Sequence, residues 1–133
     1  MLPRCLSLSI LLLAPAFLVA DTLALDFEGL PDGTTLTNQY SGVTFSNAII
    51  LTTGISLNEF EFPPHSGANV ASDNGGPMSL SFSTPIQSFS GYFTYAEPLT
   101  IDAYGVANNL LTSVTSGFSN NEALSGAPGS SPN

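Results

Sequence analysis

The residues with the greatest chemical potential gather in one stretch, EFEFPPHSGANVASDNGGP, which runs from Glu59 to Pro77. It holds the only histidine of the chain, His65, and three of its ten carboxylates. A hydrolase needs a nucleophile beside a base, but His65 and Ser66 are sequence neighbours, and neighbours in an extended chain point to opposite sides. The sequence has no Gly-x-Ser-x-Gly elbow. We therefore predict that His65 is a hydrogen-bonding loop residue and that the protein is not an enzyme.

Calcium is the one metal ion that the sequence could hold. Zinc needs a set of nitrogen and sulfur ligands, and the chain has one histidine and one cysteine, Cys5, which lies in the predicted leader. Calcium instead takes six to eight oxygens from carboxylates, carbonyls and amides. The candidate ligands are Asp26, Glu28, Asp73 and Asn74. The alternatives are that Asp73-Asn74 is a plain turn and that Glu28 is solvated at a strand end. No other cofactor is expected.

Two further kinds of site are weaker hypotheses. A glycoside hydrolase or lyase would use two carboxylates, drawn from Asp26, Glu28, Glu59 and Glu61. A carbohydrate-binding surface would use exposed aromatic rings, and its candidates are Tyr92 and Tyr104. The chain has no Trp, and these tyrosines equally suit cross-strand packing over a polar face.

Charge narrows the classes of partner. Ten carboxylates face one basic residue, Arg4, for a formal charge of -9. Such a surface repels phosphate backbones and anionic headgroups, so neither nucleic acid nor an anionic membrane surface is an expected partner. Divalent cations, neutral sugars and envelope components fit better, although an acidic surface also serves solubility alone.

The first twenty residues, MLPRCLSLSILLLAPAFLVA, have the layout of a secretory signal peptide. One basic residue precedes an apolar run, and a small residue, Ala20, ends it; Ala16 is the alternative cleavage site. The run is too short for a membrane span, and none is expected in the mature chain. Residues 1–20 are thus predicted to be removed on export, leaving residues 21–133 as one domain without a disulfide.

The mature chain is predicted to be all-β. Short alternating or β-branched runs end at Gly, Pro, Asn or Asp, and no window keeps a helical period beyond two turns. The expected strands include LALDF, EFEF, MSLSFS, IQSFSGYFTY and LTIDAYG, with GVTFS and AIILTTG on either side of Asn47 and a hairpin turn at Asp73–Gly76. Strands about every ten residues favour a jelly-roll-like antiparallel β-sandwich. The Gly/Ser/Pro-rich end offers no closing strand, so we expect the fold to be incomplete at its C-terminus.

Three phrases carry a family resemblance: LDFEGLPDGTTLTNQYSGVTFSNA, then LNEFEFPPHSGANVASDNGGPMSLSFSTPIQSFSGYFTYAEPLTIDAYG, then SGAPGSSPN. Their order over residues 23–133 resembles exported bacterial proteins of the PEP-CTERM sorting type. The resemblance implies a secreted jelly-roll-like domain, with no established enzymatic activity, in an envelope or exopolysaccharide setting. The sequence departs from that family in lacking further strands and the sorting tail of a Val-Pro-Glu-Pro-like motif, a membrane helix and basic residues.

The sequence therefore predicts a secreted, non-enzymatic structural or binding module of the cell envelope or extracellular matrix. The alternative is a calcium-stabilised carbohydrate-binding module, whose partner is an extracellular polysaccharide. A glycoside hydrolase or lyase ranks third.

Overall fold

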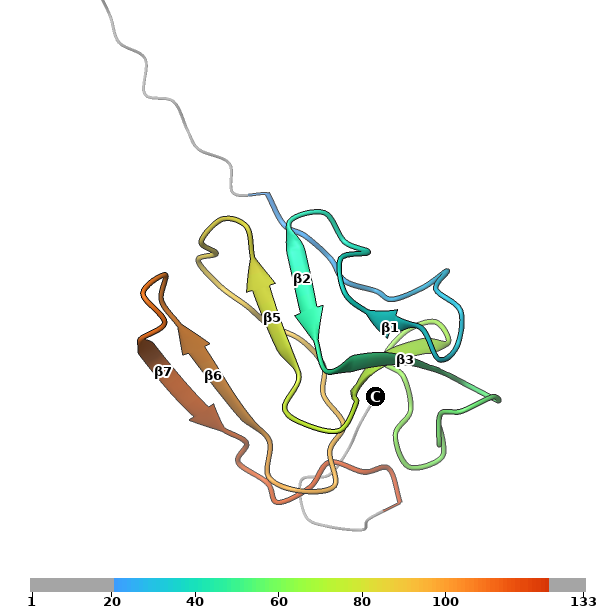
Figure 1. Cartoon of the computed structure of the whole chain (residues 1–133). Helices are drawn as coiled ribbons and strands as arrows, with labels where there is room; N and C mark the ends of the chain where they lie inside the picture. Colours follow the sequence, from blue (N-terminus) through green and yellow to red (C-terminus); the bar gives the residue numbers. More distant parts are fainter. Residues whose placement is uncertain (1–20, 125–133) are drawn as a thin grey trace, which may run out of the picture.

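The computed structural model describes residues 21–124, and this part of the chain is all-β, with seven short strands and no helix (Figure 1). The strands form three small antiparallel sheets, in the orders β1-β3-β4, β2-β5 and β6-β7. Their bounds are β1 Thr35–Leu36, β2 Val43–Ser46, β3 Ala48–Thr52, β4 Asn69–Asp73, β5 Ser79–Phe82, β6 Thr100–Tyr104 and β7 Leu110–Thr115. The predicted signal peptide and the Gly/Ser/Pro-rich end lie outside the described residues.

The best-buried strand is β3, which lies between β1 and β4. Its sequence, AIILT, is rich in β-branched residues, which suit a pleated and buried surface. Ala48 and Ile50 are fully buried, and Ile50 pairs with Ala71 of β4. With Leu36 of β1 they form one side of the core.

The second sheet supplies the rest of the core. Val43 and Phe45 of β2 are buried while Thr44 and Ser46 are exposed, as strict alternation requires. In β5, the predicted two-faced strand, Leu80 and Phe82 pack against this core and the serines are exposed. The alternation predicted for MSLSFS is confirmed in β5.

A single residue carries the chain from one sheet to the next. Asn47 separates β2 from β3 with a φ of 53°, a left-handed conformation that Asn tolerates. The two strands predicted on either side of it exist, but β2 pairs with β5 whereas β3 pairs with β1 and β4. The predicted hairpin at Asp73–Gly76 is wrong for the same reason, because this turn connects β4 to β5, which lie in different sheets.

Three predicted strands, LALDF, EFEF and IQSFSGYFTY, are absent from residues 21–124. EFEF instead forms a turn, in which the Asn58 carbonyl accepts the N–H groups of Glu61 and Phe62. Phe60 is 74% exposed rather than buried, and Pro63 and Pro64 prevent regular pairing beyond it. IQSFSGYFTY forms irregular coil with one bridge, Tyr95 to Asn121.

The N-terminal segment is packed but not paired. Residues 21–27 form no strand, although Leu25, Phe27 and Leu30 pack against the core. The chain then turns through Pro31-Asp32-Gly33, with a hydrogen bond of 3.2 Å from the Thr34 N–H to the Pro31 carbonyl. This segment covers the core without joining a sheet.

The third sheet, β6-β7, is a hairpin set apart from the other strands (Figure 1). A turn at residues 105–109 closes it, with Asn108 at a φ of 56° and the Gly105 N–H donating to the Asn109 carbonyl. Every residue of both strands is exposed. The hairpin thus contributes nothing to the core of β1 to β5.

Candidate functional site

The predicted calcium ligands lie at opposite ends of β4. The Glu28 carboxylate accepts the N–H groups of Ala68 and Asn69, both at 2.9 Å, where β4 begins. Asp26 accepts the N–H of Glu28 at 3.2 Å, so it lies beside the same loop. Asp73 lies at the far end of the strand, four residues or about 13 Å away at 3.3 Å per residue.

The structure therefore does not bring the four candidates together. In the turn after β4, the backbone N–H of Asn74 donates to the Asn47 carbonyl at 2.9 Å. Within residues 21–124, no three or more His, Cys, Asp or Glu side chains are grouped closely enough to hold a metal ion. The Glu28 carboxylate instead fixes the backbone of the Gly67–Asn69 segment.

Asn69 is the buried polar residue at this junction. Its amide donates to the carbonyls of Phe27 and Leu30, both at 2.9 Å, and its oxygen accepts the Thr52 hydroxyl at 2.7 Å. A buried amide that satisfies its donors and acceptor in this way fixes one arrangement of the chain around it. Asn69 and Glu28 together attach the unpaired N-terminal segment to β4.

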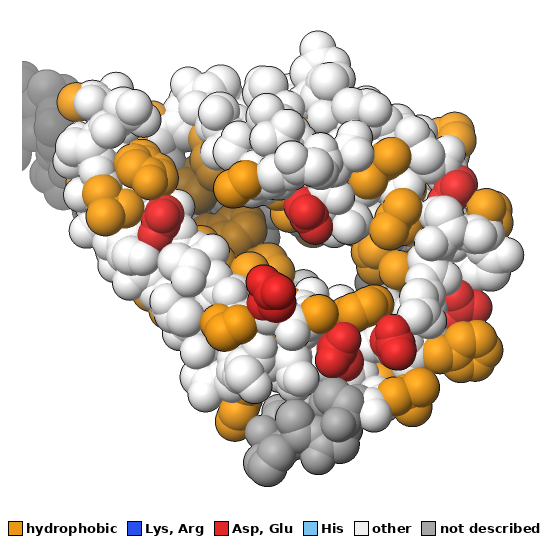
Figure 2. Space-filling view, turned by 60° about the horizontal axis from the view of Figure 1, so that its bottom comes forward, with side chains coloured by type: hydrophobic (Ala, Val, Ile, Leu, Met, Phe, Trp, Pro, Cys, Tyr) orange, Lys and Arg blue, Asp and Glu red, His pale blue; other side chains and the backbone are white. Residues whose placement is uncertain are grey.

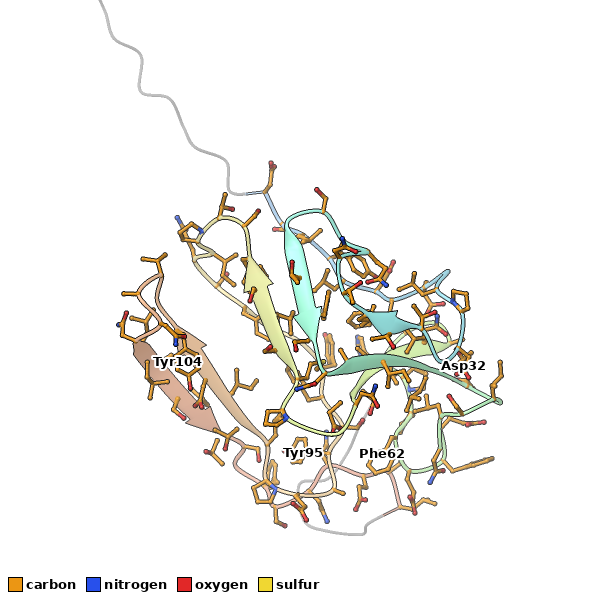
Figure 3. The ribbon with its side chains drawn as sticks, viewed as in Figure 1. Asp32, Phe62, Tyr95 and Tyr104 are labelled. Atoms are coloured by element: carbon orange, nitrogen blue, oxygen red, sulfur yellow. The ribbon has the colours of Figure 1, made fainter. Side chains whose placement is uncertain are left out.

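Asp32 forms a second junction, on the opposite side of the molecule from Tyr104 (Figure 3). Its carboxylate accepts the N–H of Thr52 at 2.8 Å and the hydroxyl of Ser56. Neither Asn69 nor Asp32 was predicted. In the sequence, Asp32 is marked by its place in the turn Pro31-Asp32-Gly33. Asn69 is marked as a polar residue two positions before Ala71, on the same face of β4.

The carboxylates considered for hydrolysis also make local contacts. Glu61 accepts the side-chain amide of Asn58 at 2.7 Å, within the turn that replaces the predicted EFEF strand. The Glu28 carboxylate accepts a hydrogen bond from the loop before β4, and the Asp26 carboxylate accepts the N–H of Glu28. These contacts hold turns in place.

Tyr40 joins the N-terminal segment to the core through its phenol. Its hydroxyl oxygen accepts the N–H of Phe27 at 2.8 Å, and the rings of Tyr40, Phe27 and Phe45 lie 6.0 to 6.2 Å apart. Burial raises the pKa of the Tyr40 phenol, and the nearby carboxylates of Asp26 and Glu28 raise it further, against the opposing effect of the Phe27 hydrogen bond. The folded protein therefore favours the neutral form of the Tyr40 phenol.

His65 stacks on one of the predicted sugar-binding tyrosines. The rings of His65 and Tyr92 are parallel within 9° with centroids 3.3 Å apart. This contact connects the Pro63-Pro64 loop to the coil after β5. Tyr92 is 76% exposed even so, but one of its faces is covered by the histidine.

Tyr104, the other predicted sugar-binding tyrosine, lies on the β6-β7 hairpin (Figure 3). Its ring is 57% exposed, and its hydroxyl is 3.4 Å from a carboxylate oxygen of Asp102. Asp102 pairs across the hairpin with Ser113, a small residue that leaves the carboxylate uncovered. The exposed ring beside a carboxylate is an arrangement that can stack on one face of a sugar and accept its hydroxyls.

An apolar trough of about 500 Å³ lies between the hairpin and the coil after β5. Its apolar lining comprises Ile86, Phe89, Phe93, Ile101, Leu111 and Val114. All but Phe93 are exposed large hydrophobic residues, and a contiguous exposed apolar surface of this kind marks an interaction site. Phe89 and Ile101, from the predicted strands IQSFSGYFTY and LTIDAYG, lie in the wall of this open trough and not in the core.

Acidic side chains are spread over one face of the molecule. Figure 2 shows carboxylates spaced around a central hollow with apolar side chains in its walls, and no basic side chain on this face. The described residues include all ten carboxylates and no Lys or Arg, since the single basic residue is Arg4. The hollow is therefore apolar within and negative around.

Comparison with protein-family models, with curated proteins and with solved structures finds no match for this chain. In the part of the chain that the structure describes, no helix has the length and hydrophobicity that a membrane crossing requires.

Proposed function

We propose that this protein is an exported, non-enzymatic binding module of the cell envelope or extracellular matrix, and that it binds through the β6-β7 hairpin and the apolar trough beside it. The exposure of both faces of this hairpin supports the proposal most directly. A two-stranded hairpin is marginally stable alone in water, and an apolar face gains stability when a partner covers it.

The proposal includes export and the complete architecture. The leader at residues 1–20 directs the chain out of the cytoplasm, and the three small sheets belong to a jelly-roll-like β-sandwich. The order of the quoted phrases, which resembles PEP-CTERM-type exported proteins, and the core shared by β1, β2 and β3 support this. The expected partners are envelope components or an extracellular polysaccharide.

Co-sedimentation with isolated envelope fragments and with purified exopolysaccharide tests the function. The full chain, expressed with its leader and recovered after export, is expected to sediment with one of the two. Val114→Asp places a charge in the trough and is expected to abolish sedimentation, whereas Ile55→Asp, at an exposed position outside the trough, leaves it unchanged. Equal sedimentation of both variants, or none for the wild type, would overturn the proposal.

Carbohydrate recognition is the second candidate, favoured by the exposed ring of Tyr104 beside Asp102. Retention on immobilised polysaccharide is expected to be lost in Tyr104→Ala and kept in Tyr104→Phe, because the phenylalanine ring retains the stacking face. Unchanged retention in Tyr104→Ala would exclude Tyr104 as the platform.

A further inference from the structure

The outer strand of the hairpin has an edge that no other described strand pairs with. Among residues 21–124, β7 pairs with β6 alone, and in Figure 1 it lies at the outer edge of the described part of the molecule. An unpaired edge presents a row of N–H and C=O groups on which another strand can form. Leu110–Thr115 contains no Pro and no charged residue that would oppose such pairing.

The two faces of the hairpin differ in chemistry. Ile101 and Val114 are paired across the strands and line the trough. Asp102 and Ser113 are the next pair, and alternation places them on the opposite face. A strand added beside β7 would therefore put every second side chain against the apolar trough and the others beside Ser113.

Charge selects the partner. Since the described residues carry ten carboxylates and no Lys or Arg, a second copy of this chain and any acidic partner are repelled. A lysine on the added strand, opposite Ser113, extends its four-carbon stem over that small side chain toward Asp102. An alternation of apolar and basic residues matches both faces at once.

We propose that an extended basic segment of another protein adds to β7 as a third strand of the hairpin, with alternate apolar side chains in the trough and its Lys or Arg side chains toward Asp102. This inference rests on the proposed function, because it names the class of partner for the same surface. Main-chain hydrogen bonds to the β7 edge supply affinity, and the two faces supply specificity.

Fluorescence anisotropy with three labelled nine-residue peptides tests the partner class. One alternates Val and Lys, one alternates Val and Glu, and one has the Val/Lys composition with its lysines grouped together. The alternating Val/Lys peptide is expected to bind the full chain at least tenfold more tightly than either of the others. Equal binding of the two Val/Lys peptides would show charge attraction without strand addition and would overturn the inference.

Variants locate the binding on the hairpin. Val114→Ala removes two methyl groups from the trough and is expected to weaken the Val/Lys peptide about tenfold. Asp102→Asn is expected to weaken it and to reduce the dependence of its affinity on salt, while Ile55→Ala changes neither. Circular dichroism confirms that each variant is folded. Binding unaffected by Val114→Ala and Asp102→Asn would contradict the assigned surface.

Sedimentation velocity of the free chain tests the remaining alternative, which is that a second copy of the chain occupies the β7 edge. The chain is expected to be a monomer at the concentrations used, and a dimer that the Val/Lys peptide fails to dissociate would show that a second copy occupies the edge. If the peptides do not bind but the chain still sediments with envelope material in a way that depends on Val114, strand addition alone would be refuted. Failure of both would refute the proposed function as well.

Discussion

The carboxylate of Glu28 lies where the side chain of residue 67 would lie if Gly67 were any other amino acid. Gly67 has a φ of 62°, and a Cβ built on it would overlap the Glu28 side chain. The same carboxylate accepts the N–H groups of the next two residues. Glu28 and the segment that begins at Gly67 are about forty residues apart in sequence, and they can pack this closely because Gly67 has no side chain.

Gly67→Ala is expected to destabilise the protein by about 2 to 4 kcal/mol, because it combines left-handed strain with displacement of the Glu28 carboxylate. In a Glu28→Ala background the overlap disappears, so the same substitution is expected to cost only the backbone strain, about 1 kcal/mol. Urea unfolding of the four proteins of this double-mutant cycle measures the difference. Equal costs in both backgrounds would show that the two residues act independently.

Asn69→Leu is expected to destabilise the fold by about 3 kcal/mol, since it leaves the carbonyls of Phe27 and Leu30 without the amide that donates to them. The same Asn→Leu change at exposed Asn38 is expected to alter the free energy of unfolding by less than about 0.5 kcal/mol. Chemical denaturation provides both values. Comparable stabilities for the two variants would contradict the role given to Asn69.

Tyr40→Phe is expected to lower stability at neutral pH by about 1 kcal/mol, because the Phe27 N–H loses its acceptor. The folded-state pKa of Tyr40 is raised above the ordinary value of 10.0, so the stability that its neutral form contributes is complete below pH 10. That contribution is lost as the pH rises from 10 through the raised folded-state pKa. The gap between the wild-type and Tyr40→Phe unfolding curves should therefore narrow above pH 10, and a constant gap from pH 7 to 11 would contradict this.

Ile50→Ala is expected to cost about 2 to 5 kcal/mol, because Ile50 is fully buried at the centre of β3. Ile55→Ala, at a residue that is 72% exposed, is expected to change stability by less than about 0.5 kcal/mol. Both variants carry the same chemical change, so thermal unfolding compares the stability lost at a core position with the stability lost at a surface position. A smaller loss for Ile50→Ala than for Ile55→Ala would show that the core is misplaced.

The strands that could be predicted from sequence include those that bury one face, together with LTIDAYG, which forms the exposed strand β6. Val43 and Phe45 alternate with polar residues and face the core, and the β-branched run of β3 is buried as its composition indicates. The pairing of these strands could not be predicted, because Asn47 permits either a hairpin or a change of sheet.

The missed segments show where alternation misleads. Phe89 and Phe93 have the spacing of a strand face, but their rings pack on each other with centroids 6.4 Å apart, and Gly91 between them weakens the strand. In EFEF, the turn that begins at Asn58 satisfies the backbone locally and turns Phe60 outward. In that segment, local hydrogen bonds determine the structure in spite of the alternating sequence pattern.

The candidate site was predicted only in part. Tyr104 is exposed as a binding residue must be, but Tyr92 lies elsewhere with His65 on one face. The carboxylates chosen for calcium were separated by β4, a distance that depends on the fold and that no local spacing encodes. The trough depends on the hairpin lying apart from the core, which is likewise a property of the tertiary structure.

Amide hydrogen exchange of the full chain, with and without the alternating Val/Lys peptide, tests the central claim most directly: the β6-β7 hairpin is the weakly held, partner-binding part of the fold. In the free protein, amides of Leu110–Thr115 are expected to exchange at least about a hundredfold faster than those of Ala48–Thr52, and the peptide is expected to slow the former alone. Equal protection of the two strands in the free monomer, or no slowing of β7 by the peptide, would contradict the account.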